Sequence, residues 1–562
     1  MPIRSKLPHK HDNSDMYEDI VTLSAEEMEH DGRNITVHTY GWWSVFDKPS
    51  EVGSPGMYSI LLDTPNVQAD MLAISEMAGV HYYEWLNDVD GDGFPGFVFD
   101  ACHGAKTYLP TNAACKNATL TIDFNANTIS SNIHYAGRLS GGGIDMYLHA
   151  AMKSNTHSEN VIGDGSVLIC TSHKCTKENS IRVSAASATD GVYTVDTNGG
   201  VLFAVIPVEQ RKHSPQETAT TTRLELQVGL SFISNEMAVV NLHEAVEAMP
   251  SVPESLSSYN VYREVVRSRW CVSLSSVLSI NEVIPGDENI TTMLYSASYR
   301  SMMSPTVYTE GGKGVHSGLY VGMDKTVHNM TEEFGSTPNE FTSVILSRGD
   351  YGFGTYSSSY FSDLSLWDTY RTQHPWLLLT QPDVAVGVIR SMLQMTIQLG
   401  AFPRWVLASV ESGCMLGESG VAAVVEAIKG QLGSTINATT IQKAFLKQST
   451  EEVPLNGRSD VVHYMTYGYV SKENTESGSS NTVTYAFDDF LLGEMSYIVG
   501  DVENGDAAMV RSKNYATIWS DERQIICPKT ASTPDTPGVL ECPISAKTSF
   551  PQYREGNAYH WS

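Results

Sequence analysis

The sequence predicts a protein of two parts, an N-terminal antiparallel β-sandwich and a C-terminal α/α toroid. The chain has 562 residues, too many for one ordinary domain, and its 41% hydrophobic residues are enough to form a sizeable core. From about residue 56 to residue 250, short β-branched runs alternate with Gly, Asn and Asp. Beyond residue 250, apolar residues recur with the period of amphipathic helices.

The strands of the first part are predicted from apolar runs that turn residues separate. The spacing of these runs is typical of an antiparallel sandwich, and they read GMYSILLD, GSVLIC, GVYTVD, GGVLFAVIPVEQ and RLELQVGLSFIS. We therefore predict a β-sandwich domain over residues 51–250. Residues 1–50 are polar, and we expect an irregular segment there.

A linker and then successive helices are predicted for the rest of the chain. The stretch EAMPSVPESLSSYNVYREVVRSRWCVSLSSVLS indicates a linker followed by a helix, which we place at residues 251–280. Residues 281–562 contain helices joined by long loops, a pattern that favours a helical barrel or toroid over a simple bundle.

The helix over residues 382–399 is the most clearly marked of these. Pro382 suits its first position, and Gly400 can close its end. One face carries an apolar stripe made of Ala385, Val388, Ile389, Met392 and Leu393. The same reasoning predicts helices in GVAAVVEAIKGQLG, with Val421, Val425, Ile428 and Leu432 on one face, and in TVTYAFDDFLLGEMSYIVG.

Charge and hydropathy exclude several classes of partner. The net charge is −28 and the isoelectric point is about 4.9, which argues against nucleic acid or an anionic membrane as the main partner. No window of 18 uninterrupted apolar residues occurs, so we expect no transmembrane helix. The first 20 residues lack the apolar core of a secretory signal.

The eight cysteines fall into two groups. Three pairs lie close together in polar sequence and predict local disulfides, namely Cys102/Cys115, Cys170/Cys175 and Cys527/Cys542. Cys271 and Cys414 stand in apolar sequence, and we expect them to be buried thiols.

The stretch SLWDTYRTQHPWLLLTQPD, residues 365–383, is the first candidate for a binding site. Trp367 and Asp368 precede a helix, with Arg371 close behind. An aromatic ring can cover the apolar face of a sugar while a carboxylate accepts hydrogen bonds from two adjacent hydroxyls. The alternative is a structural one, in which Asp368 and Arg371 pair at the helix start and Trp367 lies in the core.

The stretch YREGNAYHW, residues 553–561, is the second candidate. Glu555 precedes a glycine and several aromatic residues. A carboxyl group among aromatic rings is desolvated, which raises its pKa and suits a general acid. The alternative is a turn glutamate with no chemical role.

Two further acidic patterns favour structural interpretations. Asp88, Asp90, Asp92 and Gly93 follow the opening spacing of a calcium loop, but Phe99 stands where that loop needs a glutamate. We therefore expect a polar hairpin or loop. Asp488 and Asp489 are adjacent on a predicted helix and so point in different directions, which favours solvated or capping roles.

Together these segments resemble glycoside hydrolase family 92, the calcium-dependent exo-α-mannosidases. The resemblance extends over most of the chain in the family's order. It is carried by PGMYSILLD, VGLSFISNEMAVVNLHEAV, SLWDTYRTQHPWLLLTQPD, GAFPRWVL, VTYAFDDF and REGNAYHW. It implies a β-sandwich followed by an α/α toroid, and an enzyme that removes terminal α-mannose, with an α-1,2 preference, from N-glycans or mannans with inversion.

The resemblance also implies site residues and a cofactor. Glu555 matches the family's general acid, Asp368 matches a residue that binds the terminal mannose, and Trp367 and Arg371 are neighbours of that pocket. Calcium is expected to help bind and distort the sugar, and the mannose-containing oligosaccharide or glycoprotein glycan is the expected partner. The family resemblance further implies the secretory pathway or the extracellular space as the location.

Some positions depart from the family pattern. The segments that hold the family's calcium ligands and catalytic base have no counterpart here, so we expect them beyond Ser562, and we expect the chain to be truncated at both ends. Glu418 and Ser419 replace a Tyr-His pair, and Thr484 replaces a glutamate. Two hypotheses follow: an incomplete record of a secreted mannosidase, or a degenerate, non-catalytic mannoside-binding homologue. An unrelated glycan phosphorylase is a third, for which no phosphate-binding cluster is visible.

Overall fold

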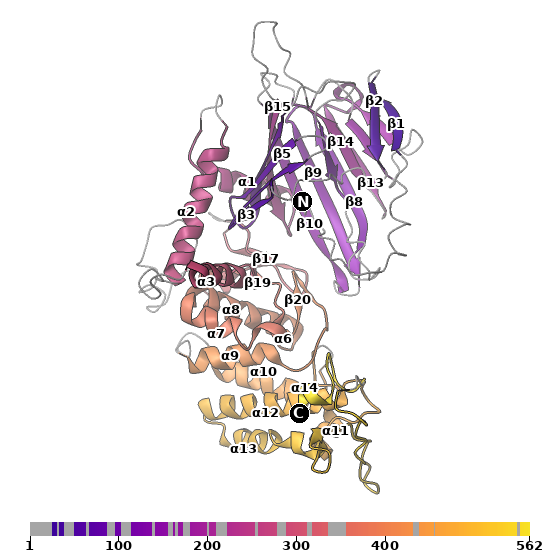
Figure 1. The fold of residues 1–562 in the computed structure, drawn as a ribbon, viewed down its shortest axis with the longest axis vertical. Coiled ribbons are helices and arrows are strands. Elements are labelled where there is room, and N and C mark those ends of the chain that lie inside the picture. Colours follow the sequence, from indigo (N-terminus) through magenta and orange to yellow (C-terminus); the bar gives the residue numbers. More distant parts are fainter. Residues whose placement is uncertain are drawn as a thin grey trace. The chain divides into compact units, whose positions relative to one another are not determined.

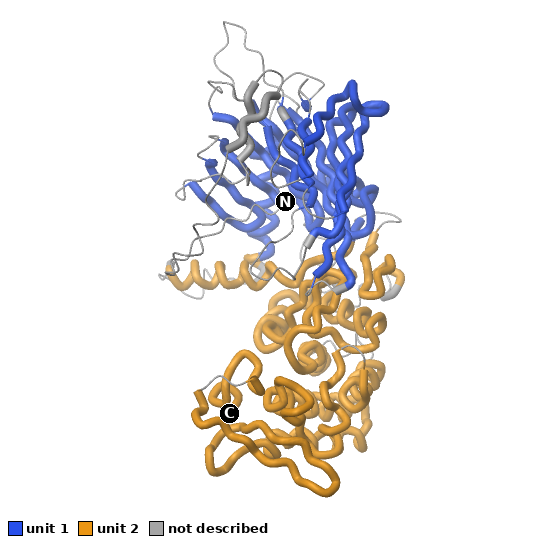
Figure 2. The backbone as a smooth tube through the Cα atoms, turned by 90° about the vertical axis from the view of Figure 1, so that its right-hand side faces the viewer, with its two compact units in different colours: residues 1–138, 142–273, 310–315 blue, residues 139–141, 274–309, 316–562 orange. Residues whose placement is uncertain are grey.

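The structure is a computed structural model in which the chain forms two compact units (Figure 2). Unit 1 comprises residues 1–138, 142–273 and 310–315, and unit 2 comprises residues 139–141, 274–309 and 316–562. The structure describes residues 25–30, 33–38, 50–62, 67–86, 96–102, 114–137, 141–154, 161–162, 167–171, 180–198, 202–208, 222–252, 257–277, 288–311, 317–334, 356–430, 438–453, 456–547 and 551–562. The predicted domain boundaries at residues 50, 250 and 280 stay predictions.

Most strands of unit 1 form one large antiparallel sheet. Within the described residues it has nine strands in the order β13-β8-β9-β10-β15-β6-β5-β4-β3. Their bounds are β3 Val52–Ser54, β4 Met57–Leu62, β5 Val67–Ala73, β6 Ala78–Trp85, β8 Ala114–Asp123, β9 Thr128–Gly137, β10 Gly141–Ser154, β13 Val192–Thr197 and β15 Thr222–Ser231. The predicted strand runs at β4, β13 and β15 are thereby confirmed.

Local turn chemistry sets the register of the hairpin between β8 and β9 (Figure 1). Asp123 stands opposite Thr128 across the turn. Its Oδ1 accepts hydrogen bonds from the backbone N–H groups of Asn125 and Ala126, each at 2.9 Å, as in an Asx turn. Asn127 then takes the left-handed φ of 52°, which asparagine tolerates better than most residues.

A second sheet covers one face of the first. It contains four strands in the described part of unit 1, in the order β12-β11-β14-β7, with bounds β7 Gly96–Asp100, β11 Val167–Cys170, β12 Ser180–Val183 and β14 Phe203–Pro207. Leu120 and Ile129 of the large sheet share one buried cluster with Ile169 and Ile206 of the small sheet. Each such side chain contributes roughly 1.5–3 kcal/mol on burial. This core between two sheets confirms the predicted sandwich.

The segment of residues 1–50 is not wholly irregular, in contrast to the prediction. Strands β1, Ala25–His30, and β2, Arg33–His38, pair antiparallel as a short hairpin. The second strand contains the β-branched residues Ile35, Thr36 and Val37, which favour extended backbone.

Two helices follow the sandwich strands. Helix α1, Asn235–Glu247, begins after Ser234, whose side chain accepts a hydrogen bond from the Met237 N–H. It packs closely on β15, because a Cβ atom added to Gly229 would lie 2.1 Å from the Ala238 carbonyl oxygen. Helix α2, Tyr259–Val277, confirms the helix predicted after the linker.

Unit 2 is mainly helical (Figure 1). The α-helices among its described residues are α3 Glu288–Ser301, α4 Met330–Phe334, α6 Leu366–Thr369, α7 Gln373–Thr380, α8 Pro382–Leu399, α9 Ser419–Lys429, α10 Ala438–Thr450, α11 Val461–Tyr467, α12 Gly478–Ile498, α13 Val502–Arg511 and α14 Ala558–Trp561. Short hairpins lie between them, namely β17 Leu319–Val321 with β18 Val327–Asn329, β20 Val406–Leu407 with β21 Val410–Glu411, and β22 Trp519–Ser520 with β23 Ile525–Ile526. β16 Thr306–Val307 pairs antiparallel with β19 Phe361–Ser362, which lies much later in the chain.

The three helices predicted in this unit are present. Helix α8 has proline at its first position and ends at Gly400, which adopts the left-handed conformation with φ of 76°. Its predicted stripe is buried except for Leu393, which is half-buried. Helix α9 is buried over most of its length, and α12 begins four residues before the predicted run at Thr482. No helix among the described residues is both long and apolar enough to cross a membrane.

The cysteines follow the prediction only in part. Disulfides join Cys102 to Cys115 and Cys527 to Cys542, as predicted. Cys170 is also disulfide-bonded, and its predicted partner Cys175 lies outside the described residues. The expectation of buried thiols was wrong, because Cys271 is exposed and Cys414 is half-buried. Cys271 stands on helix α2, where apolar neighbours in sequence point in other directions around the axis.

Candidate active site

The first predicted segment forms the short helix α6 and the turn after it. Leu366 is fully buried and anchors the segment, whereas Trp367 is half-buried and Asp368 is exposed. The Ser365 hydroxyl donates a hydrogen bond of 2.5 Å to Asp368 Oδ2, which orients the carboxylate. Asp368 therefore has lone pairs that face solvent.

Arg371 is positioned by aromatic rings. Its guanidinium carbon lies 4.7 Å from the centre of the Tyr370 ring and 6.0 Å from the centre of the Trp367 ring, which are cation–π contacts. No ion pair joins Arg371 to Asp368 in the described part of the chain. The structural alternative, an Asp368–Arg371 pair with Trp367 in the core, is therefore not what the structure contains.

The same segment contacts helix α12. The rings of Tyr370 and Phe487 lie 6.0 Å apart at an angle of 38°, and Phe487 is 41% exposed. Asp488, the next residue on α12, and Arg371 are both close enough to Tyr370 to act on it electrostatically. Burial raises the pKa of Tyr370, against the opposing effect of Arg371.

The second predicted segment lies against the beginning of α12. The side chain of Gln552, the residue directly before this segment, accepts a hydrogen bond of 3.0 Å from the Gly478 N–H, and the Arg554 N–H donates one of 2.8 Å to the Ser480 hydroxyl. Glu555 follows with a left-handed φ of 51° and an exposed side chain. We expected aromatic rings to shield Glu555 from water, but the described residues do not do so.

One face of α12 carries the contacts of both segments. Ser480, Thr484 and Asp488 are spaced by four residues and therefore lie in a row on this helix. Ser480 contacts Arg554, the residue before Glu555, and Asp488 lies near Tyr370. Ser480 and Asp488 are separated by roughly 12 Å along the helix axis, at 1.5 Å per residue. The structure thus groups Trp367, Asp368 and Arg371, and it places Glu555 separately, near the start of the same helix.

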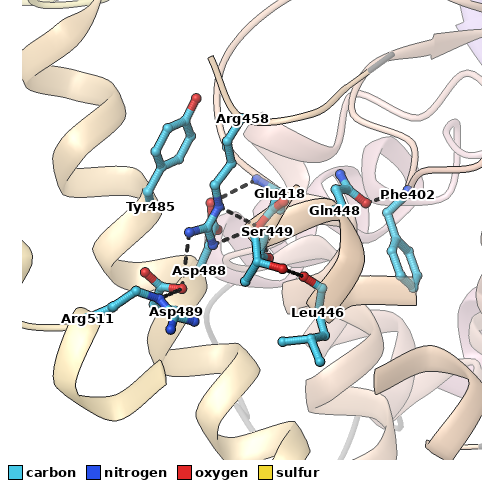
Figure 3. A network of polar contacts seen from close by, with 12 residues as sticks. Phe402, Glu418, Leu446, Gln448, Ser449, Arg458, Tyr485, Asp488, Asp489 and Arg511 are labelled. Atoms are coloured by element: carbon cyan, nitrogen blue, oxygen red, sulfur yellow. Dashed lines mark hydrogen bonds and ion pairs between the residues drawn. The ribbon is translucent and has the colours of Figure 1, made fainter. Parts of the chain in front are cut away.

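Asp488 also belongs to a buried network of charged side chains (Figure 3). Arg458 donates to Glu418 Oε2 at 3.0 Å and to Asp489 Oδ1 at 3.1 Å. Arg511 donates to Asp489 Oδ1 at 3.2 Å, and Asp488 Oδ2 accepts a hydrogen bond of 3.1 Å from the Glu418 N–H.

This network corrects the prediction for the two aspartates of α12. Asp488 is 1% exposed and Asp489 is fully buried, so neither is solvated, and Asp488 accepts a hydrogen bond from the backbone of Glu418 at the start of α9. Both belong to one network, because Glu418 hydrogen-bonds to Asp488 and pairs with Arg458, which in turn pairs with Asp489. The apolar sequence around them, YAFDDFLL, was the available signal, since a helix with apolar residues all round is usually buried.

Burial shifts the protonation of the network. It raises the pKa of Glu418, against the opposing effect of Arg458. It raises the pKa of Asp488 well above the ordinary value, and the negative charge of Glu418 adds to this shift. Burial alone would lower the pKa of Arg458, but Glu418 and Asp489 outweigh it and raise that pKa.

A calcium site is not formed by the residues described. No group of three or more His, Cys, Asp and Glu side chains in the described ranges is arranged to hold a metal ion. The calcium-loop pattern of Asp88, Asp90, Asp92 and Gly93 lies outside the described residues. The ligands that the family resemblance implies beyond Ser562 stay a prediction.

Comparison with known proteins identifies the family. The model of the glycosyl hydrolase family 92 catalytic domain matches residues 252–562. The family GH92 alpha-mannosidase BT3965 of Bacteroides thetaiotaomicron has a similar structure, with a TM-score of 0.69 and 18% identity. The match covers 92% of this chain and 58% of that one. A structure of the same mannosidase in complex with mannoimidazole matches with a TM-score of 0.66 and 18% identity, over 88% of this chain and 54% of that one.

A second mannosidase of the same organism is equally similar. The family GH92 inverting mannosidase BT2199 matches with a TM-score of 0.69 and 19% identity, again over 92% of this chain and 58% of that one. No curated protein sequence is a significant match. The chain therefore spans less than two thirds of the structures it resembles, and it shares their fold of a β-rich part followed by a helical part. With more than half of its residues matched by the catalytic-domain model, the chain belongs to glycosyl hydrolase family 92.

Proposed function

We propose that the protein is an exo-α-mannosidase that hydrolyses terminal α-linked mannose, with an α-1,2 preference, from N-glycans or mannans and with inversion. The observation that carries this proposal is the match of the family's catalytic domain to residues 252–562, which include both candidate segments. The similar structures are described as an α-mannosidase and an inverting mannosidase, which supports the same chemistry here. Secretion is part of the proposal through the family resemblance.

Asp368 is proposed to hold the terminal mannose. Its carboxylate is exposed, oriented by Ser365, and flanked by the half-buried ring of Trp367. A carboxylate accepts hydrogen bonds from two adjacent sugar hydroxyls, and the ring covers an apolar face of the sugar. Arg371 is held over Tyr370 and is proposed to complete this polar rim.

Glu555 is proposed to protonate the leaving oxygen. Its side chain is exposed, so a substrate can reach it, and its neighbour Arg554 is fixed to α12 through Ser480. An inverting enzyme also needs a carboxylate base that activates water, and neither Asp368 nor Glu555 is proposed for that role.

Calcium is expected only through the family resemblance. When bound in such an enzyme, a divalent cation polarises oxygen atoms of the sugar. The described residues do not form a fitting ligand set, so we assign none of them to calcium and derive no step from it.

A non-catalytic mannoside-binding protein is the second candidate. Glu418 and Ser419 stand where the family resemblance implies a Tyr-His pair, and Glu418 is committed to a buried ion pair with Arg458. Glu418 is thus not free to contact a sugar in the way that the family's Tyr-His pair would.

One experiment separates the two candidates. Glu555→Gln should lower mannose release from α-mannobiose by about 10²–10⁴-fold, since general acid catalysis contributes that much. An aryl mannoside with a good leaving group should be affected less, and Glu522→Gln, a change of another exposed glutamate, should leave both rates unchanged. Equal rates for Glu555→Gln and wild type on α-mannobiose would refute the assignment of the acid. Binding of α-mannobiose without any release of mannose by the wild type would support the second candidate.

A further inference from the structure

The buried network of unit 2 contains more acidic than basic groups (Figure 3). Its three carboxyl groups belong to Glu418, Asp488 and Asp489, and its two guanidinium groups belong to Arg458 and Arg511. The side chains of Glu418, Arg458 and Asp489 have no exposed surface, and Arg511 is 15% exposed. If every group were ionised, the network would hold one excess negative charge away from water.

The hydrogen bonds show which carboxyl group lacks a cationic partner. Glu418 pairs with Arg458, and Asp489 pairs with both Arg458 and Arg511. Asp489 also accepts a hydrogen bond of 2.7 Å from the Tyr464 hydroxyl. Asp488 has no ion pair among the described residues, and its one hydrogen bond comes from the backbone of Glu418.

The other groups around Asp488 do not supply the missing charge. Arg404 is nearby, but its guanidinium donates to the backbone oxygens of Met415, Gly417 and Asn456. Arg371 lies over the rings of Tyr370 and Trp367. Three phenols, those of Tyr370, Tyr464 and Tyr485, also interact electrostatically with members of the network, and burial raises the pKa of each, so they carry no charge at neutral pH.

We propose that this network retains one proton at neutral pH and that the carboxyl group of Asp488 carries it. Burying an ionised carboxylate without a partner costs several kcal/mol, so such a group takes up a proton instead. Protonation leaves two carboxylates opposite two guanidinium groups, and the network becomes neutral. The pKa of Asp488 is raised by burial and by Glu418 and Asp489 despite the opposing effect of Arg458, which agrees with this assignment.

The retained proton couples the stability of unit 2 to pH. In the unfolded chain an aspartate ionises near pH 3.9, whereas the folded chain keeps the proton to a higher pH. The stabilising effect of this proton is therefore complete below about pH 4 and is lost as the pH rises toward the folded-state pKa. In that interval the unfolding equilibrium constant increases about tenfold for each pH unit from this one group. This inference is independent of the proposed mannosidase activity.

Adjacent aspartates allow a matched test in the full chain. Urea unfolding is measured at pH 5, 6, 7 and 8 for the wild type, Asp488→Asn and Asp489→Asn. Asparagine mimics a protonated aspartate, so the stability of Asp488→Asn should not fall in this way as the pH rises. The unfolding equilibrium constant of the wild type, divided by that of Asp488→Asn, should therefore increase about tenfold per pH unit. Asp489→Asn should be less stable than the wild type at every pH, because it removes the shared partner of Arg458 and Arg511.

The outcome is decisive in either direction. A wild type and an Asp488→Asn variant with the same dependence on pH would overturn the proposal, as would equal losses of stability in both variants at pH 7. Infrared spectroscopy gives a second readout if a variant does not fold. The folded wild type at pH 7 should show the C=O stretch of a protonated carboxyl group, and this band should survive Glu310→Gln, a change of a buried acid in unit 1. Absence of the band from the wild type would overturn the proposal by itself.

Discussion

The guanidinium of Arg458 lies 3.1 Å from the carboxylate of Asp489, and neither side chain has any surface exposed to solvent. Arg458 comes from the loop before α11, and Asp489 comes from the middle of α12. A buried ion pair of this kind contributes little net stability compared with well-packed apolar side chains, but it is very costly to break. It therefore fixes which segments can pack together in unit 2.

Replacing Arg458 by leucine should destabilise the protein strongly. The change leaves Glu418 without its cation and removes one of the two ion pairs of Asp489 in a buried site, and such a loss costs about 3–5 kcal/mol. Urea unfolding at pH 7 measures the difference. The exposed pair of Lys429 and Glu494 provides the control, because Lys429→Met should change the stability by about 1 kcal/mol or less. Similar small changes for both variants would contradict the role of Arg458.

Asp368→Ala should weaken sugar binding without affecting the fold. The side chain is exposed and its hydrogen bond comes from one local serine, so the unfolding midpoint should stay unchanged. A hydrogen bond from a ligand to a charged group contributes about 1.5–3 kcal/mol. Its loss should therefore lower the affinity of the variant for α-mannobiose about 10- to 100-fold. Calorimetric titration measures this affinity. Asp535→Ala, which removes another exposed carboxylate, should bind like the wild type, and an unaltered affinity of Asp368→Ala would remove this residue from the site.

Gly229→Ala should destabilise unit 1 by about 1–3 kcal/mol, a typical cost of overpacking. The new methyl group would lie 2.1 Å from the Ala238 carbonyl oxygen and 2.8 Å from Leu242 Cβ, so α1 would have to move away from β15. Gly142→Ala is the matched control, because no atom lies within 4 Å of the added methyl group. Thermal unfolding compares the two. A loss of stability that is equal in both variants would show that close packing at Gly229 is not the cause.

Much of the fold was predictable because its signals are local. The strand at residues 192–197 is a β-branched run that begins after a glycine, and helix α8 has its own start and end signals in Pro382 and Gly400. These residues restrict their own backbone, whatever surrounds them. The irregular segment predicted for residues 1–50 shows the limit of this approach, because a short run such as RNITVH was not recognised as the strand it forms.

The candidate site was predictable only as two separate segments. The motifs around Asp368 and Glu555 were recognised from their residue types and from the family resemblance, and their roles stay predictions. That both segments contact one face of α12 could not be read from the sequence, since Ser480 is 74 residues from Arg554 along the chain. The exposure of Glu555 was also missed, because the adjacent aromatic residues do not enclose it in the described structure.

By itself, the sequence determined the order of a β-rich and a helical part, the helix ends, two of the disulfides and the family. Only the tertiary structure decided the environment of Asp488 and Asp489. Their partners Arg511, Arg458 and Glu418 are 22, 31 and 70 residues away, and no local pattern brings them together. The protonation of a carboxyl group depends on the charges and the water around it in space, so it is a property of the folded chain rather than of the residue.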